Sequence, residues 1–267
     1  MIFFPTSKLI SSWNQFLLAN GKLRKKESAK TCSKWGVITT INKPTDAILN
    51  MVNFPGWCVV IVGDRKTPLP YDLPSDSFVY LSVEIQSQLG ADDDLYKKLS
   101  TLTPWNHFGR KNFGYLYAID NGAQAVWDFD DDNVLLDNLT SIEGPAEGME
   151  VDTSCLAHNI YPDMGAPTLP CWPRGFPLVD IKKNCTRSYH NASTKKVGVF
   201  QSLANLEPDI DAIFRLTQPS PFYFKSKGGD EIGLSTVIIP RGTFVPYNAQ
   251  ATLVMRDALW SLSLPVR

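Results

Sequence analysis

The feature that most constrains the fold is a series of short apolar runs, each of which stops at polar or acidic residues. The runs are rich in β-branched and aromatic residues, as buried strands are. We expect strands at 35–41, 57–62, 78–83 and 125–127. We expect helices at 47–52, in part of 84–103, and at 115–119. Strands that alternate with helices at short intervals predict an α/β fold with a mostly parallel twisted sheet flanked by helices.

Acidic residues follow two of these strands, at Asp64 and at the run Asp130, Asp131 and Asp132. Ligands of parallel sheets bind at the carboxyl ends of the strands. Three adjacent carboxylates repel one another, and a divalent hard cation would offset the repulsion. Alternate residues of an extended segment share a side. Asp130 and Asp132 are therefore the candidate metal ligands, and Asp131 would meet a ribose or a basic residue.

We considered three catalytic or metal-binding motifs for this acidic segment, together with a turn that binds nothing. A calcium loop beginning at Asp128 fails, because Asn133 and Leu139 stand where it needs glycine and its last carboxylate. A haloacid-dehalogenase-type phosphatase, with Asp128 as nucleophile and Asp130 as acid, is an alternative. A nucleotide-sugar glycosyltransferase would use Asp-x-Asp to hold a metal on the donor diphosphate. A solvated acidic turn without a ligand fits this segment equally well.

Composition narrows the function classes. The 267 residues include 26 basic and 27 acidic side chains, a net charge of −1, which gives no field to attract nucleic acid. No apolar run approaches the roughly 20 residues of a membrane-spanning helix.

We interpret residues 1–32 as a tail or linker and 33–267 as one domain, with an irregular Pro-rich insert at 140–190. Later strands are expected at 197–200 and 234–239, and a helix at 249–262.

The glycosylation motifs mildly favour a protein of the secretory pathway, and the cysteines allow a disulfide. Cys58 lies in an apolar run and is expected to be a buried thiol. A disulfide could form among Cys155, Cys171 and Cys185. Sequons begin at Asn138, Asn184 and Asn191, so we expect a glycoprotein.

Several unusual strings, in the same order, resemble the STELLO family of Golgi glycosyltransferase-like proteins. They lie at 34–45, 57–68, 111–119, 130–133, 172–178, 209–216 and 246–253. The resemblance covers roughly residues 34–266. It implies a GT-A-like fold, a Rossmann-type domain that holds a nucleotide sugar, with uridine as the expected base, together with Mn²⁺ or Mg²⁺.

The resemblance also implies a setting. Family members are mostly Golgi membrane proteins, and the plant members associate with the assembly of cellulose synthase. The expected partners are therefore a nucleotide sugar, a glycan or protein acceptor, and a glycan-synthase complex. We find no N-terminal membrane anchor, and the chain stops before the family's domain does. We therefore expect a C-terminally short domain in the Golgi or secreted, and a non-catalytic assembly module is the alternative to an enzyme.

On this resemblance, donor-binding residues follow the first two strands and begin the helix before the acidic run. The first strand is followed by Thr40, Asn42 and Lys43, where a GT-A fold receives the base, although Thr45 could equally make this a helix-capping turn. Asp64 could accept a hydrogen bond from base or ribose, or form a simple turn. Arg110 and Lys111 would suit a diphosphate, or be a solvated basic pair.

Acceptor-side candidates lie further along the chain. Asp209 and Asp211 form a second Asp-x-Asp, which could supply a general base or cap a helix after Pro208. Trp172 and Arg174 lie in the Pro-rich segment, where they could stack on a sugar and pair with a phosphate, or form a small hydrophobic plug.

Overall fold

The computed structural model divides the chain into two compact units: Met1–Leu139 with Val254–Arg267, here called unit 1, and Thr140–Leu253, called unit 2. The chain thus leaves unit 1 once and returns to it at its end. The residues that the structure describes are 32–73, 77–135, 142–165, 171–204, 208–217, 224 and 236–264. The predicted tail lies outside them except for Cys32, and so does Asn138.

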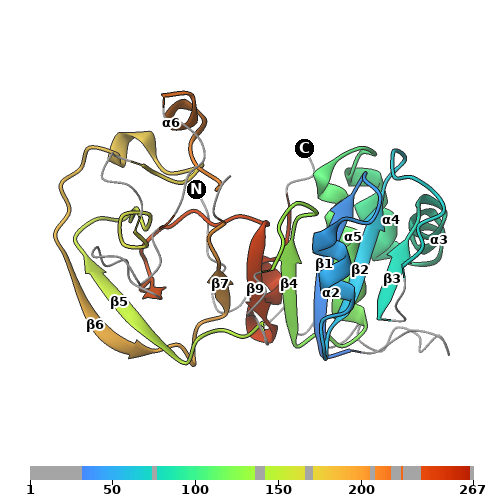
Figure 1. The fold of residues 1–267 in the computed structure, drawn as a ribbon, viewed down its shortest axis with the longest axis horizontal. Coiled ribbons are helices and arrows are strands. Elements are labelled where there is room, and N and C mark those ends of the chain that lie inside the picture. The colour runs from blue at the N-terminus through green and yellow to red at the C-terminus, as the bar shows by residue number, and fades with distance from the viewer. Residues whose placement is uncertain are drawn as a thin grey trace. The chain divides into compact units, whose positions relative to one another are not determined.

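Unit 1 is built on a parallel sheet (Figure 1). Its strands are β1 (Lys34–Thr40), β2 (Cys58–Gly63), β3 (Phe78–Leu81) and β4 (Ala125–Phe129). All six residues of β2 and all five of β4 are buried, as expected of parallel strands covered on both faces. The full strand order of this sheet is β3-β2-β1-β4-β9-β7, and its last two strands, β9 (Ala251–Met255) and β7 (Val199–Gln201), come mostly from the part of the chain assigned to unit 2. The predicted α/β class is confirmed.

Helices cover both faces of this sheet (Figure 1). They are α2 (Asp46–Val52), α3 (Val83–Asp92), α4 (Asp94–Leu102) and α5 (Lys111–Asp120). Gly36 faces Met51 of α2, whereas a Cβ on Gly114 of α5 would lie 2.6 Å from the side chain of the neighbouring Val37. Successive strand residues point to opposite faces, so α2 and α5 pack on opposite sides.

The order of the strands creates a switch point beside β1. From β1 the chain passes through α2 to β2 on one side, and it returns through α3, α4 and α5 to β4 on the other. Connections therefore diverge at the carboxyl ends of β1 and β4. In open parallel sheets this is the place where ligands bind.

Unit 2 contains a three-stranded sheet in the order β6-β5-β8. Its strands are β5 (Glu147–Thr153), β6 (Arg187–Ser193) and β8 (Val237–Ile238), and the short helix α6 spans Ala212–Thr217. A disulfide between Cys155 and Cys185 joins the end of β5 to the start of β6. The segment expected to be irregular therefore holds strands, which the sequence hides because β6 is polar and mostly exposed.

Two expectations are wrong. The helix predicted at 249–262 is strand β9 followed by a 3-10 helix at Arg256–Ser261. Thr252, Leu253 and Val254 are all buried, so this run is covered on both faces, a pattern that periodicity cannot separate from a buried helix. Cys58 is bonded to Cys32 rather than being a free thiol, because the segment entering β1 runs beside the start of β2. Among the described helices, none is long and apolar enough to cross a membrane.

Candidate functional site

The loop after β1 contacts the acidic run after β4, at the switch point. Thr40 Oγ1 donates a hydrogen bond to Asp131 Oδ2, and Asn42 Nδ2 donates to the same oxygen at 2.9 Å. The backbone N–H of Asn42 donates to Thr40 Oγ1 at 3.0 Å. Thr40 and Asn42 therefore lie beside Asp131, which is about 90 positions later in the sequence, and all three are predicted donor-binding residues. Lys43 is exposed on the same loop.

Lys111, the first residue of α5, is buried beneath the acidic run. Its Nζ lies 2.5 Å from Asp128 Oδ1 and 3.1 Å from Asp130 Oδ1, and it donates to the carbonyl oxygen of Phe129 at 2.8 Å. Tyr115 Oη donates to Asp128 Oδ2 at 2.6 Å. An internal cation therefore offsets part of the repulsion that the sequence argument assigned to a metal ion. It also rules out the alternative that Lys111 is a solvated cation, and a contact of Lys111 with a diphosphate stays a prediction.

Burial and pairing act in opposite directions on this ion pair. Burial raises the pKa of Asp128 to about 6, although Lys111 and Tyr115 lower it. Burial would lower the pKa of Lys111, but Asp128 and Asp130 outweigh it and leave that pKa raised. At neutral pH both groups are charged. A phosphatase nucleophile at Asp128 would have to leave this buried pair, so the geometry argues against the phosphatase alternative.

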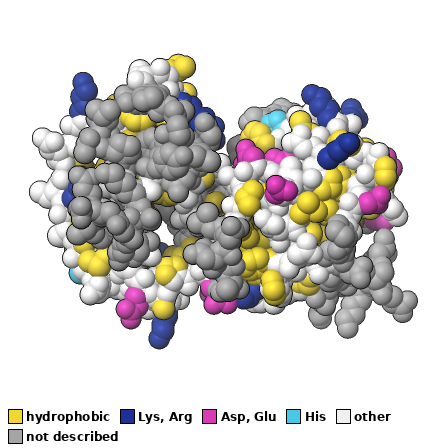
Figure 2. All heavy atoms as spheres, in the orientation of Figure 1, with side chains coloured by type: hydrophobic (Ala, Val, Ile, Leu, Met, Phe, Trp, Pro, Cys, Tyr) yellow, Lys and Arg dark blue, Asp and Glu magenta, His cyan; other side chains and the backbone are white. Residues whose placement is uncertain are grey.

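Asp130 and Asp132, the predicted metal ligands, lie at the turn that follows β4. The side chain of Asp130 is 49% exposed and meets Lys111 through one oxygen, and Asp132 is exposed. Figure 2 shows acidic side chains gathered on the visible surface of unit 1. Within the described ranges, no group of three or more His, Cys, Asp or Glu side chains is arranged to hold a metal. Mg²⁺ commonly takes only one or two carboxylates and completes its shell with phosphate oxygens and water.

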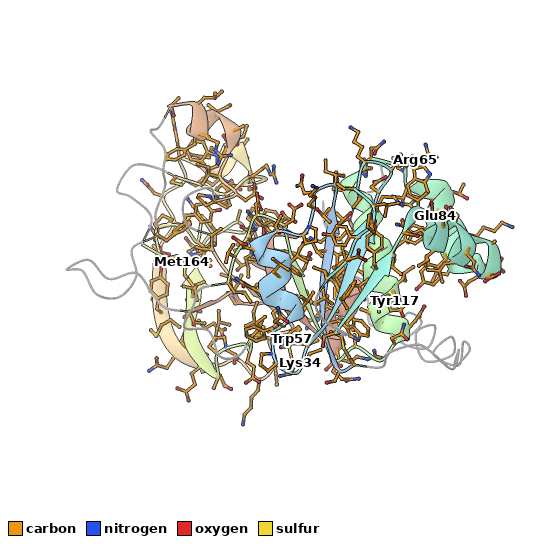
Figure 3. The ribbon with its side chains drawn as sticks, turned by 45° about the vertical axis from the view of Figure 1, so that its right-hand side comes forward. Lys34, Trp57, Arg65, Glu84, Tyr117 and Met164 are labelled. Carbon is orange, nitrogen blue, oxygen red and sulfur yellow. A yellow bond between two sulfur atoms is a disulfide. The ribbon has the colours of Figure 1, made fainter. Side chains whose placement is uncertain are left out.

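Asp64 directly follows β2 and holds together the loops around the strand ends. It is buried, and its carboxylate accepts hydrogen bonds from the backbone N–H groups of Arg65 at 2.7 Å and His107 at 3.3 Å. Its own N–H donates to Thr67 Oγ1, which donates to the carbonyl of Thr40 at 2.6 Å. Figure 3 places Arg65 at this edge and Lys34 at the opposite, amino edge of the sheet.

Arg110 is fully buried below the same loops. Its guanidinium lies 3.7 Å from the ring centroid of Trp105 and donates to Gln86 Oε1. Burial lowers its pKa to about 10. The solvated interpretation is therefore wrong, and a direct contact with a diphosphate stays a prediction.

Sequence reasoning missed Gln86, which supports the site from below. This fully buried side chain donates to the carbonyl oxygens of Gly63 and Leu81, both at 2.7 Å, and so joins the ends of β2 and β3. A single glutamine in a polar helix gives no sign of burial. Trp105 and Tyr115 were missed as well, because nothing in the local sequence marks their contacts with Arg110 and Asp128.

A second group of predicted residues lies within unit 2. Arg174 pairs with Asp209 through two contacts, Nε to Oδ1 at 2.9 Å and Nη2 to Oδ2 at 3.1 Å. Asn248 Nδ2 also donates to Asp209 Oδ2, at 3.0 Å. The backbone N–H of Asp211 donates to the carbonyl of Trp172 at 3.1 Å. Residues predicted separately as acceptor-binding and catalytic are therefore neighbours.

The capping interpretation holds for Asp211. Its Oδ1 accepts from the backbone N–H groups of Ile213 at 2.9 Å and Phe214 at 3.3 Å, at the start of α6. The Trp172 ring packs edge-on against Phe214, with 5.6 Å between ring centroids. Trp172 thus helps to anchor α6, as the hydrophobic-plug interpretation expected.

No protein-family model matches the chain. Two curated proteins of Arabidopsis thaliana do resemble it: probable glycosyltransferase STELLO1, 29% identical over 95% of this chain, and probable glycosyltransferase STELLO2, 29% identical over 96%. The resemblance to the STELLO proteins is confirmed. The chain spans about a third of the length of these relatives, 33% of STELLO1 and 34% of STELLO2.

Proposed function

We propose that the chain is a metal-dependent glycosyltransferase with a GT-A-like fold, and that unit 1 binds a nucleoside-diphosphate sugar, with a uridine nucleotide as first candidate. The observation that carries the proposal is the contact of Asp131 with Thr40 and Asn42 at the switch point of a parallel sheet. The names of the STELLO relatives, both probable glycosyltransferases, support the same reaction class.

The donor side follows from the side chains at this edge. Asp130 and Asp132 would hold Mn²⁺ or Mg²⁺, and the metal supplies charge stabilisation for the departing nucleoside diphosphate. Asp131, oriented by Thr40 and Asn42, faces the base and ribose. Buried Lys111 fixes the backbone of Phe129 and so sets where the acidic turn begins.

The acceptor side is assigned to the group in unit 2. Asp209 is the candidate base, and Trp172 and Arg174 are the candidate acceptor contacts. Asp209 is held by Arg174 and Asn248, so an acceptor hydroxyl must share its carboxylate with these partners. Asp211 serves the fold as the cap of α6.

The disulfides support an oxidising compartment, the Golgi lumen or the exterior. Two of them close in the described residues, Cys32 with Cys58 and Cys155 with Cys185. The alternative function in that compartment is a non-catalytic module that associates with a glycan-synthase complex and helps to assemble it.

A titration of uridine diphosphate with and without Mn²⁺, followed by thermal unfolding, tests the proposal. A ligand at 100 times its dissociation constant adds about 2.7 kcal/mol of stability. We expect this gain in the wild-type protein with metal, and its loss in Asp132→Ala. The matched control is Asp92→Ala, which removes an exposed carboxylate at the end of α3 and should keep the gain. If no nucleotide stabilises the protein, the proposal is wrong and the assembly module is favoured.

A further inference from the structure

The two sequons of unit 2 whose positions are described lie at the outer edge of its sheet. Asn184 is exposed in the segment that leads into β6, and Asn191 is exposed on β6 itself. Among the residues that the structure describes, β6 pairs only with β5 in the order β6-β5-β8 and is therefore an edge strand. Both asparagines thus stand where an attached group would meet solvent.

An edge strand of this length carries a physical cost. The seven residues Arg187–Ser193 all pair with β5 on one side, and the outer side presents backbone groups to any other strand that approaches. Proteins commonly block such edges with charged or bulky groups. A glycan is both bulky and solubilising, and it belongs on a surface.

We propose that the β6 edge is N-glycosylated, at Asn184 and at Asn191. The inference rests on the secretory setting proposed above, because a chain receives this modification in the endoplasmic reticulum on its way to the Golgi or the exterior, from a transferase that uses a lipid-diphosphate-linked oligosaccharide. In the reaction, Nδ2 of asparagine forms a bond to the anomeric carbon of the oligosaccharide. The bond from that carbon to the diphosphate oxygen breaks, the lipid diphosphate leaves with the electron pair, and the amide nitrogen loses one proton to a base of the transferase.

The folded structure accommodates a glycan at Asn184. The neighbouring residues, not Asn184, tie this segment to the end of β5: Cys185 is bonded to Cys155, and Thr186 exchanges two hydrogen bonds with Ser154. These are Thr186 N–H to Ser154 Oγ at 3.1 Å and Ser154 N–H to the Thr186 carbonyl at 3.2 Å. Among the described residues, the contacts that anchor this segment do not use the asparagine side chain.

The same holds at Asn191. Its backbone lies opposite Met149 in the antiparallel ladder, and the side chain projects from the ladder into solvent. The residues before and after it in the strand keep their pairing with β5 when only Nδ2 is modified. A glycan there would cover the outer side of β6.

The test expresses the full chain behind a secretory leader in eukaryotic cells, in an Asn138→Gln background so that the third sequon contributes nothing. Peptide N-glycosidase turns each glycosylated asparagine into aspartate, which mass spectrometry locates in the peptides. We expect conversion at both sites. Thr186→Ala should abolish it at Asn184 only, and Ser193→Ala at Asn191 only, because each variant keeps the asparagine and removes the hydroxyl that the sequon needs.

Disulfide mapping of the same sample separates the inference from the setting on which it rests. If Cys155–Cys185 is closed but an asparagine is recovered unconverted, the inference is overturned at that site while the secretory setting stands. Conversion that persists in Thr186→Ala or Ser193→Ala would also overturn it, since the modification would then not be directed by the sequon. The nucleotide titration of unit 1 is independent of either result.

Discussion

Lys111 is the residue on which the acidic turn most depends. A buried ammonium serves Asp128, Asp130 and the carbonyl of Phe129 at once, and all three belong to the end of β4 or the turn after it. The repulsion between these carboxylates is offset by the ammonium group of Lys111, which lies at the start of the helix that precedes β4. A metal ion at Asp130 and Asp132 would add to this arrangement.

Replacing Lys111 with methionine should therefore destabilise the protein strongly. The change leaves Asp128 buried without its cation, and breaking a buried pair in this way costs about 3 to 5 kcal/mol. Urea unfolding measures the loss. Lys43→Met, which removes an exposed lysine from the same edge, should change the free energy of unfolding by less than about 0.5 kcal/mol. Equal losses in the two variants would contradict the assignment.

The pH dependence of stability isolates Asp128. Its pKa is raised from 3.8 to about 6 in the folded protein, so between these values the folded state binds more protons than the unfolded state. Stability contributed by this group is therefore greatest at low pH and falls as pH rises through that window. The free energy of unfolding of wild type minus that of Asp128→Asn should fall by up to about 3 kcal/mol from pH 4 to 7. A difference that stays flat from pH 4 to 7 would contradict the raised pKa of Asp128.

At the scale of elements, the contact of α5 with the sheet is set by a missing side chain. Gly114 lets the helix approach Val37 and Val62 so closely that a Cβ would lie 2.6 Å and 2.9 Å from their methyl groups. This approach brings the start of α5, and with it Lys111, to the end of β4. Glycine costs helix stability, and here the cost is offset by the packing distance.

Gly114→Ala and Gly90→Ala form a matched pair that tests this packing. Both residues are in helices, and alanine favours a helix by roughly 0.5 to 1 kcal/mol over glycine. At Gly90 in α3 the nearest atom to a Cβ is Ser100 Cβ at 3.4 Å, so we expect a small gain in stability. At Gly114 we expect a net loss of about 1 to 3 kcal/mol from overpacking, measured by chemical denaturation. A gain at both positions would show that the helix can withdraw without cost.

At the scale of the whole molecule, the chain is two units, and the donor candidates all belong to unit 1. Hydrogen exchange with uridine diphosphate and Mn²⁺ should therefore slow in amides of the β1 loop and of the turn after β4. The β5–β6 ladder of unit 2 should exchange at an unchanged rate. Addition of Mg²⁺ or Mn²⁺ without nucleotide is the control, since carboxylates alone complete only part of the metal's shell. Protection confined to unit 2 would contradict the donor assignment.

The sequence by itself determined the α/β class, the four parallel strands β1 to β4, and the acidic turn as a site candidate, because buried parallel strands are continuous apolar runs and their ends are marked by polar residues. The sequence left open which two of Cys155, Cys171 and Cys185 form a disulfide. What a residue contacts across the fold was decided by tertiary structure alone. The sequence left Arg110 and Lys111 as diphosphate contacts or as a solvated pair, and the fold buries both of them. The segment 249–262 has a helical pattern, but its first part is a strand that is covered on both faces. A local sequence pattern predicts whether a segment is buried. It does not predict which residues bury the segment, because these come from distant parts of the chain.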